Sequence, residues 1–118
     1  MHPSNMRPPG TREAILQAER EILQALCRGT LEGSVKAAAM EILGSYTFQE
    51  SVHQLVFETL REIPSDDPEL LRAQLLVRLN NKGFPDLDLE AFFQPHALSA
   101  GGAVERMRAL RATASRQT

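Results

Sequence analysis

Apolar side chains recur in the first part of the chain with the spacing of one helix face. Residues three or four positions apart supply this face: Ile15, Ala18, Ile22 and Leu26. That period is typical of an amphipathic α-helix and predicts a first helix that begins after Thr11 and ends before Gly29. Thr11 is a suitable N-cap, and Gly29 can adopt the left-handed conformation that ends a helix. The polar side is expected to comprise Glu13, Glu19, Arg20, Glu21 and Gln24.

A second helix is predicted from about Glu32 to Leu43, closed by Gly44. Its inner stripe should comprise Leu31, Val35, Ala38, Ala39, Ile42 and Leu43. The alanines on this stripe are small enough to let a neighbouring helix approach closely. Helix packing therefore accounts for the whole segment.

A third helix is predicted from a capping box. In Thr47-Phe48-Gln49-Glu50, the side chains of Thr47 and Glu50 are expected to satisfy each other's free backbone N–H groups. A broad apolar face follows: Phe48, Val52, Leu55, Val56, Leu60 and Ile63. Pro64 should end the helix, because proline cannot continue the hydrogen-bond ladder.

The rest of the chain predicts a long fourth helix and two shorter ones. Asp67 is a good N-cap, and Pro68 suits the first helical position. The core face of the fourth helix should comprise Leu70, Leu71, Leu75, Leu76 and Leu79. A short helix over about 89–93 follows from an Asp88 cap. Gly101-Gly102 is expected to separate a last helix, in which Val104, Met107 and Leu110 recur every three residues.

These elements predict one all-α domain, a compact bundle of five to six short helices without a strand. A chain of 118 residues can bury one core but not two. We expect a disordered arm over residues 1–10, where three prolines and a glycine cluster. The helical core should span 11–98. A C-terminal helix with a frayed tail should occupy 99–118.

Composition narrows the class of protein. Apolar residues make up 42% of the chain, enough for a packed core. The net charge of −2 argues against nucleic acid as a direct ligand. No apolar run approaches the roughly 20 residues that span a bilayer, and no signal-peptide pattern opens the chain, so a cytoplasmic protein is expected. A single cysteine, Cys27, precludes an internal disulfide and fits a reducing compartment.

Candidate chemistry is sparse. There is no glycine-rich phosphate loop, and His2, His53 and His96 lack metal-ligand spacing, so neither a cofactor nor a metal is expected. Cys27 and His53 could form a thiolate–imidazole pair. Cys27 ends an amphipathic helix, however, and is interpreted as a small apolar core residue. No catalytic residue is nominated, and the chain is not expected to be an enzyme.

Two segments together carry a resemblance. They are Ala18-Glu19-Arg20-Glu21-Ile22-Leu23 and Phe48-x4-His53-x2-Val56-Phe57. The pair resembles a helical domain shared by two bacterial replication proteins, the helicase-binding C-terminal domain of primase and the N-terminal domain of the replicative helicase. Leu75-x3-Leu79-x3-Gly83 is similar to the helicase form, whereas residues 67–71 are closer to primase. The resemblance covers about residues 11–93.

Two positions depart from the family pattern. Gln54 stands where the family has an arginine after the histidine, and Ser51-Val52 replaces a segment that contains proline in primase. Phe48 and Phe57 are expected to pack against the first two helices. His53 is expected to be half-buried and bonded to a backbone carbonyl or a loop, in a structural role.

The resemblance implies a non-catalytic protein–protein interaction module of DNA replication. Its partner would be the replicative helicase or primase, and a homodimer is left open. In that family the last helices dock on the partner or on a second copy. By position, the residues that would bind the partner here are Val104, Met107, Arg108, Leu110 and Arg111.

The alternative is a small helical DNA-binding regulator. Such a protein needs a recognition helix rich in basic and amide side chains. The second predicted helix has Lys36 as its only basic residue, and the third has none before Arg61. Residues 103–118 carry four arginines and one glutamate, a net charge of +3, which could contact phosphates but favours a solvated tail.

Overall fold

The chain folds into an all-α helical bundle. The computed structural model describes residues 12–30, 34–65, 67–94 and 99–117. The expected arm over 1–10, the Thr11 cap and residues 31–33 at the predicted start of the second helix lie outside these residues. The second helix begins later than predicted, at Lys36, because Ser34 and Val35 are not helical. The elements are five α-helices and one 3-10 helix: α1 (Arg12–Arg28), α2 (Lys36–Leu43), α3 (Ser51–Glu62), α4 (Pro68–Asn81), η2 (Glu90–Phe93) and α5 (Ala100–Gln117).

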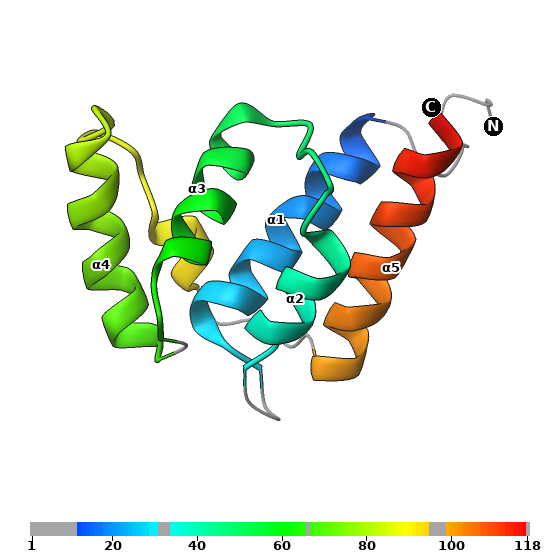
Figure 1. Cartoon of the computed structure of the whole chain (residues 1–118), viewed down its shortest axis with the longest axis horizontal. Coiled ribbons are helices and arrows are strands. Elements are labelled where there is room, and N and C mark those ends of the chain that lie inside the picture. Colours follow the sequence, from blue (N-terminus) through cyan, green and yellow to red (C-terminus); the bar gives the residue numbers. More distant parts are fainter. Residues whose placement is uncertain (1–11, 31–33, 66, 95–98, 118) are drawn as a thin grey trace, which may run out of the picture.

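The helices lie side by side, with α1 in the middle (Figure 1). α5 and η2 pack closely on α1, α2 packs on α5, and α3 bridges α1 and α4. In the view of Figure 1, α4 forms one end of the row and α5 forms the other. None of the helices in the described ranges is long and apolar enough to cross a membrane.

α1 supplies much of the core because apolar residues occupy one side of it. Its buried positions are Ile15, Glu19, Ile22, Leu23, Ala25, Leu26 and Cys27. The helix ends as predicted at Gly29, which has a φ of 85° and whose N–H donates to the Ala25 carbonyl at 2.9 Å. The prediction that Glu19 lies on the polar side is wrong, since this carboxylate is buried in the core.

The connection between α2 and α3 differs from the predicted capping box. Thr47 lies outside the helix and is exposed, and Glu50 is the N-cap of α3 instead. The Glu50 carboxylate accepts from the Val52 N–H at 3.2 Å. Thr47 is not needed as a cap, because the Glu19 carboxylate of α1 takes the N–H groups that precede α3. The helix ends at Glu62, before Pro64, as predicted.

α4 begins as predicted, with the Asp67 carboxylate accepting from the Leu70 N–H at 3.2 Å and Pro68 in the first turn. Its core face is narrower than expected and consists of Leu71, Leu75 and Leu79. The prediction that Leu70 and Leu76 are core residues is wrong, since both are exposed. α4 lies at the end of the row, so only one of its sides has a helix to cover it (Figure 1).

The C-terminal segment also departs from expectation. Gly101 and Gly102 do not separate elements but lie inside the first turn of α5. Ser99 offsets their low helix propensity, because its hydroxyl accepts from the Gly102 N–H at 3.0 Å. α5 continues to Gln117, through the polar end that was expected to fray. The short helix at 90–93 is 3-10 rather than α.

One continuous core joins all these elements. α5 contributes Ala103, Met107 and Leu110 to it, and η2 contributes Phe92. Within α2, only Ala39 and Leu43 are buried in the core. Ala38 and Ile42 of the predicted stripe are partly exposed. The C-terminal helix is therefore a structural part of the bundle rather than an appendage to it.

Candidate functional site

A buried carboxylate, Glu19, binds the segment that leads into α3. Its Oε2 accepts from the Tyr46 hydroxyl and from the Gln49 N–H, each at 2.6 Å. Its Oε1 lies 2.8 Å from Nδ1 of His53 and 3.4 Å from the Glu50 nitrogen, which also donates to it. Glu19 has 0% of its surface exposed, and His53 is also buried. We call these five residues the Glu19 network.

Three elements bring the Glu19 network together. Glu19 comes from the inner side of α1, Tyr46 from the connection after α2, and His53 from the first turn of α3. The backbone N–H groups before a helix have no partner within it, and a negative charge there also interacts favourably with the helix dipole. Glu19 therefore fastens the start of α3 to the middle of α1.

The hydrogen bonds of the network keep Glu19 ionised. Burial by itself raises the pKa of a carboxyl group. Four donors outweigh burial, those of His53, Tyr46, Gln49 and Glu50, so that the pKa of Glu19 is lowered overall. The pKa of Tyr46 is raised by burial and by its bond to the Glu19 carboxylate. Tyr46 is thus held as the neutral donor.

Aromatic rings enclose the network. Tyr46 and Phe48 meet edge to face with centroids 5.0 Å apart, and Phe48 lies 4.9 Å from Phe57. The His53 ring is 6.0 Å from Phe92 of η2. His53 is therefore more deeply placed than predicted, and its bond goes to a carboxylate rather than to a backbone carbonyl. The arrangement holds α1, α3 and η2 together and offers no open face to a substrate.

Two side chains of the network were not predicted to take part in a site, those of Glu19 and Tyr46. A signal for Glu19 was present, because it follows Ile15 by four residues and precedes Ile22 by three, which places it within the apolar stripe. A charged residue at such a position is buried only if it has partners. No local pattern marks Tyr46, which precedes its helix by several residues.

Two further predictions concern cysteine and metal. Cys27 is buried, and burial raises the pKa of its thiol to about 12, which suits the predicted role of a small core residue. The ring nitrogen Nδ1 of His53 is occupied by Glu19 rather than by a thiolate. Over the described ranges, no group of three or more potential ligand side chains could hold a metal ion.

The five residues predicted to bind a partner are divided by the structure. Met107 and Leu110 are buried in the core between α5 and its neighbours, and Val104 is partly buried. Arg108 and Arg111 are exposed on the outer side of α5. The apolar stripe that was expected to face a partner therefore covers this chain's own α1 and α2, because those two helices need it to complete the core.

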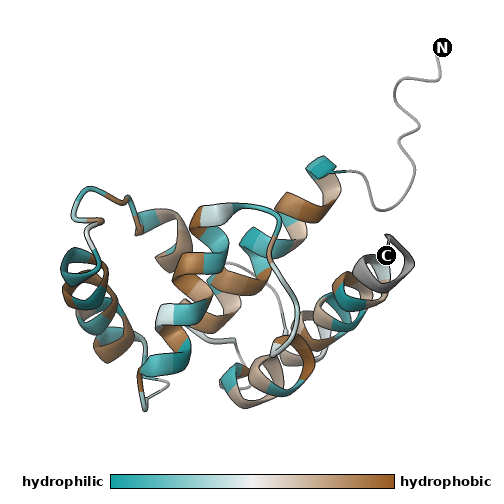
Figure 2. Ribbon diagram, turned by 45° about the horizontal axis from the view of Figure 1, so that its top comes forward, coloured by the Kyte–Doolittle hydropathy of each residue, from teal (hydrophilic) through white to brown (hydrophobic). Residues whose placement is uncertain are grey.

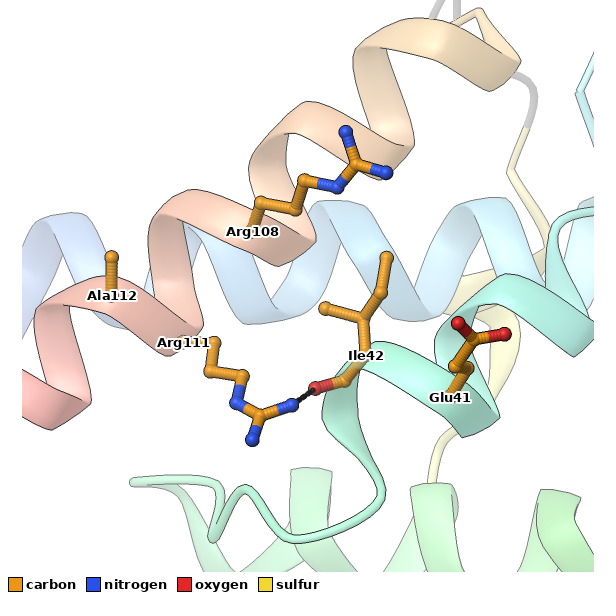
Figure 3. Close-up of a pocket in the computed structure, with 5 residues that line it drawn as sticks. All are labelled: Glu41, Ile42, Arg108, Arg111 and Ala112. Carbon is orange, nitrogen blue, oxygen red and sulfur yellow. Dashed lines mark hydrogen bonds between the residues drawn. The ribbon is translucent and has the colours of Figure 1, made fainter.

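Arg108 and Arg111 line a surface groove between α5 and the end of α2, which we call the arginine groove (Figure 3). Its volume is ≈ 530 Å³, and its other lining residues are Glu41, Ile42 and Ala112. Arg111 donates from Nη1 to the Ile42 carbonyl at 3.0 Å. That carbonyl is in the last turn of α2, where acceptors lack partners within the helix, so Arg111 fixes the groove's geometry.

The arginine groove combines an apolar floor with charged walls. The Ile42 side chain lies between the two arginines and Glu41 (Figure 3). Two guanidinium groups and one carboxylate leave a formal charge of +1. Arginine is suited to binding carboxylates, because its planar fork can donate two parallel hydrogen bonds. The groove can therefore accept an acidic, partly apolar segment of another protein.

Comparison of the chain with protein-family models, with curated proteins and with solved structures found no match.

Proposed function

We propose that this chain is a non-catalytic protein–protein interaction module of bacterial DNA replication, acting in the cytoplasm and similar to the primase–helicase interaction domain. The observation that carries the proposal is the 2.8 Å contact between Glu19 and His53. These two residues belong to the two sequence segments on which the resemblance rests. The two residues are 34 positions apart in the chain, yet they meet in one buried network.

The departure at Gln54 also has a structural account. Its Oε1 accepts from the Phe48 N–H at 2.7 Å, and its Nε2 donates to Glu58 at 2.8 Å. The amide therefore ties the motif phenylalanine to α3, and it does so without the positive charge that the family has at this position. The segment therefore accommodates glutamine at this position with hydrogen bonds of its own.

The arginine groove is the surface we assign to the partner. Of the five residues predicted from the resemblance, Arg108 and Arg111 line the groove, while Met107 and Leu110 hold α5 in place from the inside. An acidic helix or strand of the replicative helicase or of primase would find paired guanidinium groups there. A charged rim of this kind mainly accelerates association and selects the partner.

The test is a mixing experiment with the replicative helicase and the primase of the same organism. Light scattering behind a sizing column should show the chain moving into one of the two partner peaks. Arg108→Glu should weaken the complex about tenfold or more, since a repulsive charge replaces an attractive one. Arg20→Glu makes the same change on α1, away from the groove, and should leave binding intact.

Three results would count against the proposal. They are absence of a complex with either protein, equal effects of the two charge reversals, and salt-sensitive binding of duplex DNA in its place. The last would favour the DNA-binding regulator, whose affinity must fall steeply with salt because it neutralises phosphates.

A further inference from the structure

α4 has an unpartnered apolar face. Within the ranges that the structure describes, four large hydrophobic side chains are exposed, and all lie on this helix or just after it. They are Leu70 (52% exposed), Leu76 (49%), Val77 (56%) and Phe84 (46%). Apolar bands appear on both sides of α4, the leftmost helix of Figure 2. Clustered exposed apolar side chains of this kind mark interaction surfaces.

The spacing of these residues defines one stripe. Leu70, Ala73 and Val77 are separated by three and four residues, so they lie on one side of the helix, with Leu76 on its flank. The buried residues Leu71, Leu75 and Leu79 lie on the opposite side. Ala73 is small, which lets a second helix approach the middle of the stripe. We call Leu70, Ala73, Leu76 and Val77 the α4 stripe.

The charged side chains beside the stripe are directed to groups within the chain. Arg72 pairs with Glu90, and its guanidinium lies over the Phe93 ring at 5.6 Å. Arg78 lies 3.4 Å from the Glu62 carboxylate, and Lys82 lies 2.7 Å from it. The centre of the α4 stripe is therefore uncharged, so it neither attracts a highly charged partner nor repels an identical surface.

The two ends of α4 have opposite charge. Asp67 and Glu69 give the first turn a formal charge of −2. At the other end, Arg78 and Lys82 share the single carboxylate of Glu62, which leaves +1. A copy of the same helix running antiparallel would place each acidic end beside a basic end, and the helix dipoles would also oppose one another favourably. A parallel copy would place like charges together.

We propose that the α4 stripe binds a second copy of this chain, forming a symmetric dimer through an antiparallel pair of α4 helices. A two-fold axis gives both copies the same surface, so that Leu70 of one copy faces the Val77 region of the other around Ala73. The contact is one helix wide, which belongs to the small, reversible class of interfaces. It lies at the opposite end of the row from the arginine groove and is independent of the partner proposed above (Figure 1).

Sedimentation velocity over a series of concentrations, with the full chain, tests the dimer. The wild-type chain should show a monomer–dimer equilibrium, and Val77→Glu should raise the dissociation constant about tenfold or more, because it places a carboxylate against Leu70 and beside the acidic first turn of the other copy. Gln17→Glu adds the same charge at an exposed position on α1, away from both proposed surfaces, and should leave the equilibrium unchanged. Circular dichroism would establish that both variants remain helical.

Cross-linking tests the antiparallel orientation. When the Leu70→Cys chain and the Val77→Cys chain are mixed and oxidised, the mixed disulfide should predominate over the two symmetric ones. Cys27 does not compete, since it is buried. The symmetric disulfides alone would overturn the orientation. A chain that is monomeric at every concentration would overturn the dimer, as would equal effects of Val77→Glu and Gln17→Glu or loss of helicase or primase binding in Val77→Glu alone.

Discussion

Glu19 shows how one buried charge can organise a small helical protein. Burying a carboxylate costs several kcal/mol of folding free energy unless other groups replace the hydrogen bonds that it made with water. Here Tyr46, His53 and two backbone N–H groups replace them. The same bonds satisfy the N–H groups ahead of α3, which would otherwise be left without partners. The charge therefore specifies where α3 begins relative to α1.

Removing this carboxylate should be among the most damaging single substitutions in the chain. Glu19→Ala leaves Tyr46 and His53 without their acceptor, and we expect a loss of about 3–5 kcal/mol in the free energy of unfolding. Glu19→Gln keeps the shape but offers fewer acceptor sites, and should cost about 1–3 kcal/mol. Gln17→Ala, an exposed change on the same helix, should cost less than about 0.5 kcal/mol in the same urea titrations. Equal losses for Glu19→Ala and Gln17→Ala would contradict the assignment.

The lowered pKa of Glu19 makes the free energy of unfolding depend on pH in the acidic range. A carboxyl group whose pKa is lower in the folded state stabilises the fold above its unfolded value, ordinarily 4.5, and loses that contribution as the pH falls through the folded value. Unfolding free energy should therefore fall below about pH 4.5, and Glu19→Gln should flatten this part of the curve.

Glu62 provides the control for that experiment. Its pKa is also lowered, by Lys82 and Arg78, but its carboxylate is exposed. Salt screens exposed pairs far more than buried ones. In high salt the pH dependence due to Glu62 should shrink while that due to Glu19 persists. If salt removes the whole dependence, the buried network is not its source.

At the scale of the helix, neighbouring leucines on α4 should behave in opposite ways. Leu75 is buried against the core, whereas Leu76 is exposed on the far side. Leu75→Ala should cost about 2–5 kcal/mol through the cavity it leaves, and Leu76→Ala less than about 0.5 kcal/mol, measured by urea unfolding at low protein concentration. Similar losses of stability for both variants would show that Leu76 belongs to the core, as the leucine pattern predicted.

The α4 leucines also show how far local patterns can predict a fold. Asp67, Gly29 and Pro64 were placed correctly at helix ends, because a cap, a left-handed turn and a missing N–H act within a few residues. Leu70 and Leu76 were wrongly assigned to the core, since their exposure depends on which helices lie beside α4. Glu19 was misplaced for the same reason, as its partners are about 30 residues away in the chain.

At the scale of the whole molecule, two surfaces lie at opposite ends of one row of helices. The arginine groove is formed by α2 and α5, whereas the α4 stripe is formed by one helix at the far end (Figure 1). Between them, the Glu19 network joins α1 to α3. This layout would leave both surfaces accessible at the same time, so that the proposed partner and a second copy of the chain would not compete.

The stability of the bundle depends on α5, although the sequence predicted a core that ends at residue 98. Three side chains of α5 enter the core, those of Ala103, Met107 and Leu110. Burying one large apolar side chain contributes about 1.5–3 kcal/mol, and a whole domain is stable by about 5–15 kcal/mol. Deleting residues 99–118 should therefore abolish cooperative unfolding in urea. A chain that ends after Thr113 keeps all three contacts and should unfold like the full chain. If the chain cut after residue 98 unfolds cooperatively at near full stability, the core does not need α5.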